Sequence, residues 1–463
     1  MESTCPPHKL AAGKLLILRG EENGREMQRH RTRAAILSTI FMGLGQIYNR
    51  QFIKGLIFLA VEAFSVYYFI GNLGRAIWGI TSLGDAASHF EKVKGIKQLI
   101  PGDHSIYILI QSLITLIIFV VIFIAWYMNI KDAYKTGVER EAGLQSNSFK
   151  QTIRYILDYK FAQTFLILPT IGILFFTVMP IIFMIMLAFT NYAAPNHLPP
   201  AKLVDWVGFE TFRNLLVLKT WSHTFYGVLT WTIIWAVLST VTTYFGGLLV
   251  ALLVSQRGIR FKGMWRVILI VPYAVPQLIS LLLMRNLFNG QFGPINQYLG
   301  YFGMGGLPWL TDPFWAKVTV IVVNMWVGIP VSMLLIMGVL TTIPRDMYEA
   351  AEVDGATAYQ KFRIVTLPMI LFSTAPTLIM QFAGNINNFN AIFLLTGGNP
   401  VNGNYQYAGS TDLLVTWLYK LTLDQNKNNM ASAIGIIIFV IVASFSLYNY
   451  RRTKSFKEED MIQ

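Results

Sequence analysis

Residues 349–368 read Glu-Ala-Ala-Glu-Val-Asp-Gly-Ala-Thr-Ala-Tyr-Gln-Lys-Phe-Arg-Ile-Val-Thr-Leu-Pro, a polar, charged stretch between two long apolar segments. The 463-residue chain around it is 54% hydrophobic and only 13% charged, with a mean hydropathy of +0.49. Soluble globular domains carry about 25% charged residues. The composition therefore predicts an all-α, polytopic membrane protein in which this stretch is a loop between two spans.

Eight segments are apolar over the roughly 20 residues that a helix needs to cross a bilayer. They are 52–71, 105–129, 162–190, 223–254, 264–288, 315–340, 367–396 and 430–450. Segment 34–48 is also apolar but about five residues too short to cross. We expect it to form an interfacial or re-entrant helix that leads into the first span.

The net charge of +13 comes from Lys and Arg that gather in five connecting segments. Cytoplasmic loops of membrane proteins are enriched in these residues, so the charge indicates a lipid bilayer and no nucleic acid as partner. The basic segments are the N-terminal tail, the connection between the second and third spans, the turn near 257–262, the loop around 349–368 and the C-terminal tail. They alternate correctly along eight spans if both termini are cytoplasmic, as expected for a multi-pass protein of the cell membrane.

This topology divides the chain into four parts. We predict a basic cytoplasmic tail, an interfacial helix with two transmembrane helices, a six-helix core that contains the cytoplasmic loop 344–368, and a cytoplasmic C-terminal tail. Their ranges are 1–33, 34–160, 161–450 and 451–463.

The loop itself has the local signals of two short helices. Pro344 suits the first turn of a helix because that position needs no amide hydrogen, and good helix formers follow over 345–352. Gly355 permits a backbone turn. A second short helix is predicted over 357–365, before Leu-Pro at 367–368 opens the next span. The loop should therefore form a helix-turn-helix knob.

The first helix of the knob offers a surface for another protein. Ala350 and Ala351 allow close approach, and Glu349 presents a carboxylate that can accept a bidentate arginine. An ordinary amphipathic connector is the alternative, but the full spacing on the cytoplasmic side favours docking. The sequence contains no Gly-x-x-x-x-Gly-Lys-[Ser/Thr] phosphate loop, so an ATPase that docks here would be a separate subunit.

Two stripes of polar and small residues recur at helical spacing inside predicted spans. The seventh span carries Gln381, Gly384, Asn385 and Asn388. The sixth carries Asn324, Val327, Gly328 and Val331, and there Gly328 with Pro330 can open or kink the helix. Unpaired amides are costly in hydrocarbon, so such stripes face either a wet cavity or a neighbouring helix. Amides both donate and accept, which suits sugar hydroxyls, but hydrogen bonding between packed helices explains the stripes equally well.

Several passages resemble one family. The loop residues match the Glu-Ala-Ala…Gly…Ile-x-Leu-Pro signature of permeases in binding-protein-dependent ABC importers, with Val365 in place of Ile. Four further passages look like the larger permease of the maltose and maltodextrin importers, the MalF type. They are Val271-Pro-Tyr-Ala-Val-Pro276, Asn324-Met-Trp-Val-Gly328, Asn385-Ile-Asn-Asn-Phe-Asn390 and Gly409-Ser-Thr-Asp-Leu-Leu414.

The resemblance implies an ABC importer permease fold and a translocation subunit that is not an enzyme. By this resemblance the two stripes, all eight residues, contribute to the sugar site. The residues that couple to the ATPase are Glu349, Ala350, Ala351, Gly355, Leu367 and Pro368. The implied partners are a second, MalG-like permease, two ATPase subunits, an extracellular sugar-binding protein and an oligosaccharide substrate. No cofactor or metal is expected on this chain, because ATP and Mg would bind the partner ATPase.

Two departures from the family pattern affect the substrate. The connection 191–222 leaves no room for the large exterior domain of the family's best-known members, and Gly384 and Val331 stand where aromatic residues of the sugar site are expected. Another sugar or a small polar solute is therefore an alternative to maltodextrin. An ion-coupled secondary sugar transporter is a further alternative, which would show paired repeats and intramembrane ionisable groups for ion coupling. Eight spans, a Glu62 without a partner and the docking loop argue against it.

Overall fold

The computed structural model describes residues 30–451 apart from four short gaps, at 94–95, 145–148, 199–201 and 257. Nearly all of the predicted cytoplasmic tails therefore lies outside the described residues. The chain divides into two compact units, and each is described by itself. The first comprises residues up to 184 with 199–205, and the second comprises 185–198 with residues from 206 onward. The part boundaries proposed from the sequence stay predictions.

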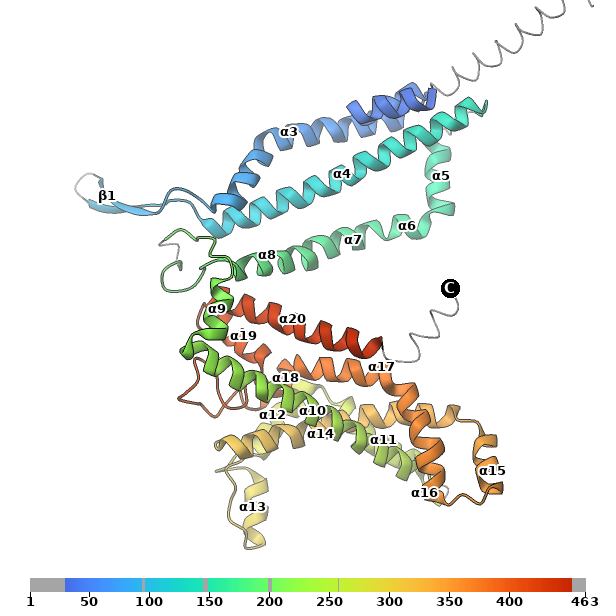
Figure 1. Cartoon of the computed structure of the whole chain (residues 1–463), viewed down its shortest axis with the longest axis vertical. Coiled ribbons are helices and arrows are strands. Elements are labelled where there is room, and N and C mark those ends of the chain that lie inside the picture. The colour runs from blue at the N-terminus through green and yellow to red at the C-terminus, as the bar shows by residue number, and fades with distance from the viewer. Residues whose placement is uncertain (1–29, 94–95, 145–148, 199–201, 257, 452–463) are drawn as a thin grey trace, which may run out of the picture. The chain divides into compact units, whose positions relative to one another are not determined.

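The first unit contains three long apolar helical stretches and one hairpin (Figure 1). A helix over 30–40 comes first. It is followed by α2 (Leu44–Tyr48), α3 (Phe52–Ser82), β1 (His89–Val93), β2 (Ile96–Ile100), α4 (Ser105–Glu141), α5 (Phe149–Tyr159), α6 (Phe161–Phe165), α7 (Ile167–Ile173), the π-helix η1 (Leu174–Val178) and the first part of α8 (Met179–Ala188), whose residues from Ile185 onward belong to the second unit.

The predicted interfacial segment 34–48 is two short helices that fold back against α4. Gln46 is fully buried, and its amide donates to the carbonyl of Asn129 at 3.1 Å and to the carboxylate of Asp132 at 3.0 Å. Lys54 pairs with the same carboxylate at 2.7 Å, where α3 begins. Glu62 hydrogen-bonds to the backbone at Met42, in the turn before α2. The segment therefore does not cross as a span, as its length predicts.

The connection between α3 and α4 is more structured than the sequence indicated. The helix α3 runs to Ser82, and β1 pairs antiparallel with β2, His89 opposite Ile100. Asp103 closes the connection by accepting from two backbone N–H groups, those of Asp85 and Ala86, both at 2.9 Å. These two donors hold the pKa of the Asp103 carboxyl below its usual value.

The second unit contains the remaining helices. They are α9 (Glu210–Val217), α10 (Lys219–Ser255), α11 (Lys262–Ala274), α12 (Gln277–Leu287), α13 (Pro294–Tyr301), α14 (Pro313–Thr342), α15 (Arg345–Val353), α16 (Ala358–Lys361), the π-helix η2 (Phe362–Thr366), α17 (Leu367–Ile386), α18 (Phe389–Leu395), α19 (Leu414–Leu423) and α20 (Asn428–Tyr450).

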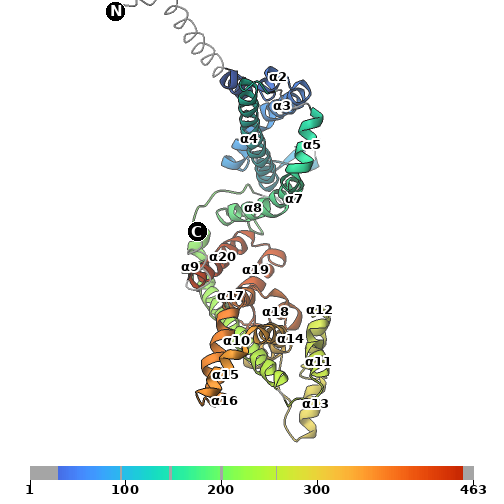
Figure 2. The same cartoon turned by 90° about the vertical axis from the view of Figure 1, so that its right-hand side faces the viewer.

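Helices α10 and α14 lie side by side along much of their length in both views (Figures 1 and 2). Small residues bring them together. A Cβ at Gly328 would lie 2.6 Å from Thr243, and one at Gly247 would lie 2.5 Å from Ser332. Since lipid tails are as apolar as the helices, such close backbone packing drives association within a membrane. The long helix α14 runs without interruption through Gly328, so the helix does not open there, and the kink at Gly328 and Pro330 stays a prediction.

The contacts between α10 and α14 also bear on how the chain crosses. Lys317 meets Trp231, Gly328 meets Thr243 and Ser332 meets Gly247, a nearly constant offset along the two helices. The two helices therefore run parallel and enter from the same side. The chain between them must cross back once, so the pair α11 and α12, which is bent by 90°, counts as one span. With this pair counted as one span, the seven other candidate helices complete the eight predicted spans.

Two predicted spans have different shapes from those expected. The fifth, 264–288, is the bent pair, broken between Ala274 and Gln277. The seventh, 367–396, ends at Ile386, and a separate short helix, α18, follows. Both corrections concern residues near the predicted sugar site.

Candidate functional site

The loop 344–368 forms the predicted knob, which projects beyond the end of α14 (Figure 1). The second short helix predicted over 357–365 is not separate from the seventh span, because α16, η2 and α17 continue as one helix from Ala358 to Ile386. The turn between α15 and α16 is built on Gly355, whose φ of 74° favours glycine. A capping box follows, in which Thr357 and Gln360 satisfy each other's backbone amides. The ammonium of Lys361 pairs with Glu352 at 2.7 Å across the turn. The knob is thus a preformed, braced unit.

A hydrogen bond attaches the knob to the spans. The hydroxyl of Tyr348 on α15 lies 2.9 Å from that of Thr366, at the start of α17. Leu367 packs into the core formed by α10, α14 and α17, and Pro368 occupies the first turn of α17. Motion of the knob would therefore be passed to α17, because the Tyr348–Thr366 hydrogen bond and the packing of Leu367 join the two.

The outer face of the knob has the composition of a docking surface. Glu349 and Ala350 are exposed, Ala351 is half-buried, and no ion pair of Glu349 is present among the described residues. Val353, Tyr359 and Ile364 are also largely exposed apolar side chains. Small and apolar residues near the unpaired Glu349 carboxylate fit a protein partner.

A cavity of about 790 Å³ lies between α11, α12, α14 and α17. We call it the amide-lined cavity. Six residues predicted for the sugar site line it: Asn324, Val327, Gly328, Val331, Gln381 and Asn388. The amide of Asn388 lies 3.5 Å from the side-chain oxygen of Asn324, and Gln381 donates to Thr243 at 2.8 Å. The structure therefore brings the whole sixth-span stripe and half of the seventh-span stripe to one hollow.

The other two predicted residues lie elsewhere. Asn385 is buried, its amide donates to Thr240 at 2.9 Å, and its backbone carbonyl accepts from the indole of Trp235 at 3.0 Å. These bonds join α17 to α10, which is the interhelical role that the sequence left open. Gly384 is exposed, with open space where a Cβ would be. Because α17 ends at Ile386, the seventh-span stripe is not one continuous helical face.

The break between α11 and α12 adds residues that the sequence reasoning missed. It places Tyr273 and Gln277 on the wall of the amide-lined cavity. Gln277 lies 3.4 Å from the amide of Asn390, and Tyr273 is 59% exposed. The signal was the pair Pro272 and Pro276, which interrupts helical hydrogen bonding.

Comparison with known proteins identifies a common family. Residues 243–452 match the model described as "Binding-protein-dependent transport system inner membrane component". The galactooligosaccharides transport system permease protein GanP of Bacillus subtilis is 40% identical over 92% of this chain and 98% of its own length. The maltodextrin transport system permease protein MalC of Streptococcus pneumoniae is 38% identical over 95% of this chain and 100% of its own. The MalF permease of Vibrio parahaemolyticus is 42% identical over 54% of this chain and 48% of its own.

The fold also has a counterpart among solved structures. A chain of a bacterial ABC transporter involved in the import of the acidic polysaccharide alginate superposes with a TM-score of 0.52. It is 22% identical and covers 66% of this chain and 98% of its own. At this identity the likeness concerns the fold alone.

Proposed function

This chain belongs to the binding-protein-dependent family of ABC sugar importer permeases, and we propose that it carries maltodextrin-type oligosaccharides through the membrane by alternating access. It is a multi-pass membrane protein and a translocation subunit. We place the loop 344–368 and both termini in the cytoplasm, in agreement with the distribution of Lys and Arg.

The chemistry of the amide-lined cavity carries the proposal of a neutral sugar. None of the described residues that line it is charged. Asn324, Gln381 and Asn388 supply both donors and acceptors, which sugar hydroxyls need, whereas a phosphorylated solute would require basic side chains. Tyr273 adds an aromatic surface. We propose that this cavity binds the sugar, while Asn385 holds α17 against α10.

We propose the partners from the knob and from the family. The unpaired Glu349 and its small neighbours would dock an ATPase subunit, and Gly355, Leu367 and Pro368 would make the knob move with α17. The complete importer would contain a second, MalG-like permease, two ATPase subunits that bind ATP and Mg, and an extracellular sugar-binding protein. In this scheme ATP-driven closure of the ATPases moves the knob, and α14 and α17 re-expose the cavity.

Galactooligosaccharides are a second candidate substrate, because the relative named for them is 40% identical over nearly the whole chain. Uptake by proteoliposomes that contain the complete importer would decide between the two. We expect ATP-dependent uptake of labelled maltotriose delivered by the binding protein, with little uptake of a galactose trisaccharide. The reverse preference would assign the second substrate. Uptake that survives ATP depletion but collapses with an ionophore would refute the ATP-driven mechanism.

A further inference from the structure

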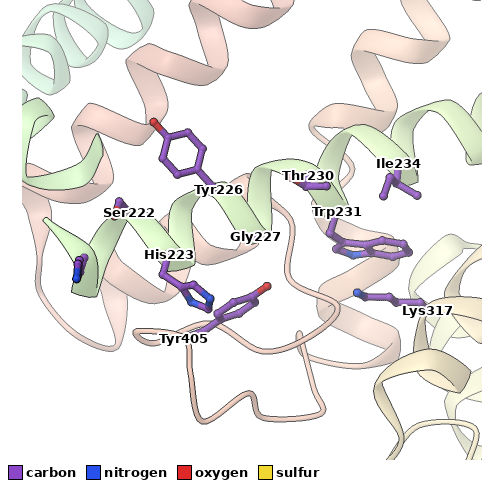
Figure 3. Close-up of a pocket in the computed structure, with 10 residues that line it drawn as sticks. Ser222, His223, Tyr226, Gly227, Thr230, Trp231, Ile234, Lys317 and Tyr405 are labelled. Carbon is purple, nitrogen blue, oxygen red and sulfur yellow. The ribbon is translucent and has the colours of Figure 1, made fainter. Parts of the chain in front are cut away.

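A second cavity, of about 850 Å³, lies between the first half of α10, the start of α14 and the loop 397–413 (Figure 3). We call it the outer cavity, since it lies at the end of α14 opposite to the knob. Its volume is within the range of about 300–1,000 Å³ that is typical of small-molecule sites. A smaller hollow of about 250 Å³ shares Trp231, Lys317 and Tyr405 with it.

Two lysines, Lys219 and Lys317, line the outer cavity. Lys317 lies against its aromatic residues. Its ammonium lies 4.8 Å from the centre of the Trp231 ring, and the indole N–H of Trp231 donates to the carbonyl of Thr411 at 3.1 Å. No carboxylate among the described residues pairs with Lys317. An ammonium carries three donors, so this one can donate to acceptors of a ligand in the cavity.

An aromatic wall faces Lys317. Figure 3 shows His223 and Tyr405 on the same side of α10 as Lys317, with ring centres of His223 and Tyr405 5.7 Å apart. The hydroxyl of Tyr405 lies so close to Gly227 that a side chain at position 227 would collide with it. The glycine therefore lets the tyrosine lie against α10 beside the cavity.

The loop that carries Tyr405 is held in place by its neighbours. The backbone N–H of Gln406 donates to Thr224 at 2.8 Å, and its carbonyl accepts from the indole of Trp417 at 2.9 Å. Farther along the loop, the buried carboxylate of Asp412 pairs with Lys420 at 2.6 Å. A wall that is ordered before a ligand arrives loses less entropy on binding.

The outer cavity and the amide-lined cavity share one face of α14. Lys317 and Asn324 are seven residues apart, which is two helical turns or about 10 Å along the axis. Between them, Val320 and Val323 are buried in a core with Trp231 and Trp235, so a chain-like ligand that contacts both cavities has to pass alongside this core.

We propose that the outer cavity binds the sugar units of an oligosaccharide that extend outward beyond the amide-lined cavity. The inference rests on the proposed function of this chain. The rings of Tyr405 and His223 offer flat apolar surfaces to the C–H face of a sugar ring. Lys317 donates to hydroxyl oxygens at its edge. The cavity would thus favour long substrates over short ones.

Transport kinetics of substrates of two lengths test the proposal. The complete reconstituted importer is assayed with oligosaccharides of two and six units, of the malto or galacto series that the wild type carries. In Lys317→Met and Tyr405→Leu we expect the KM for six units, relative to that for two, to rise about tenfold, as loss of one good contact predicts. Phe314→Ala, on the exposed first turn of α14, should leave the ratio unchanged. An unchanged ratio in both cavity variants would overturn the proposal.

Cysteine labelling tests binding without relying on kinetics. Cys5 is the single cysteine, so Cys5→Ser with His223→Cys gives one label site in the outer cavity. We expect the six-unit sugar, with its binding protein, to slow maleimide labelling about tenfold, and the two-unit sugar to have little effect. Tyr298→Cys on exposed α13 is the control. Equal labelling with both sugars, or a site that is blocked without sugar, would refute the outer cavity.

The two proposals fail in different ways. A wild-type importer that carries neither series in an ATP-dependent manner refutes the proposed function, and with it the ligand assigned to the outer cavity. Normal uptake of both lengths, with unchanged KM ratios and unprotected labelling, refutes the outer cavity alone.

Discussion

Glu349 on α15 has an exposed carboxylate, which forms no ion pair with any residue that the structure describes. Its neighbour Glu352 is already paired with Lys361. If Glu349 accepts from an arginine of the ATPase, Glu349→Ala removes a charge-assisted hydrogen bond worth about 1.5–3 kcal/mol. We expect about a 10- to 100-fold weaker ATPase association and loss of sugar-stimulated ATP hydrolysis. Co-purification and ATPase assays measure both.

Asp354→Ala is the matched control for this experiment. Asp354 is also exposed, one residue before Gly355, and the described structure gives it no ion pair. It should retain association and transport. Normal sugar uptake by Glu349→Ala would remove Glu349 from the coupling role.

Asn324 and Asn385 separate two roles that the sequence could not. Asn385 donates to Thr240 on α10, whereas Asn324 lines the amide-lined cavity and, among the described residues, its side chain accepts only from Asn388, at 3.5 Å. We expect Asn385→Ala to lower stability by about 1 kcal/mol, the scale of one hydrogen bond between membrane helices. Asn324→Ala should instead raise the KM for sugar about tenfold with little change in Tm. Thermal unfolding and uptake kinetics distinguish the two roles. A lower Tm in Asn324→Ala together with a higher KM in Asn385→Ala would exchange the roles of the two residues.

At the scale of elements, the sequence predicted the knob well because its signals are local. Pro344, Gly355 and Thr357 determine a helix start, a turn and a cap within a few residues of themselves. The stripe at Gln381 and Asn385 was predicted less well. Helical spacing says which residues share a face, but the neighbouring helix decides whether that face meets water or protein.

The break between α11 and α12 was not predicted, although its cause is in the sequence. Hydropathy averages over a window and so treats 264–288 as one span, whereas Pro272 and Pro276 act on individual hydrogen bonds. A consequence of the break is that Tyr273 lines the amide-lined cavity. Tyr273 thus provides an aromatic ring in a site whose expected aromatic positions are occupied by Gly384 and Val331.

This placement predicts that Tyr273 contributes to sugar affinity through its ring. Tyr273→Ala should raise the KM for oligosaccharide about tenfold, on the scale of one aromatic contact. Tyr273→Phe keeps the ring and should remain close to wild type. Tyr301, exposed on α13, gives the control Tyr301→Ala. An equal loss in Tyr273→Phe would transfer the contribution from the ring to the hydroxyl.

At the scale of the whole molecule, membrane topology depends on whether the bent pair crosses. Charge alone places residues 256–262 and the knob on one side. The parallel packing of α10 and α14 reaches the same arrangement independently, because Trp231 and Thr243 on α10 meet Lys317 and Gly328 on α14 in the same order. Two arguments with different physical bases therefore agree on eight crossings.

Single cysteines in the Cys5→Ser background can test this topology in intact cells. Arg260→Cys precedes the bent pair, Tyr298→Cys follows it, and Asp354→Cys lies in the knob, all at exposed positions. A membrane-impermeant maleimide added outside should label Tyr298→Cys alone, and all three sites should react once the membrane is permeabilised. If Arg260→Cys and Tyr298→Cys reacted from the same side, the bent pair would be a re-entrant loop. In that case α10 and α14 could not both enter the membrane from the outer side. The chain leaves α10 on the inner side, and it must cross the membrane once to reach the start of α14 on the outer side.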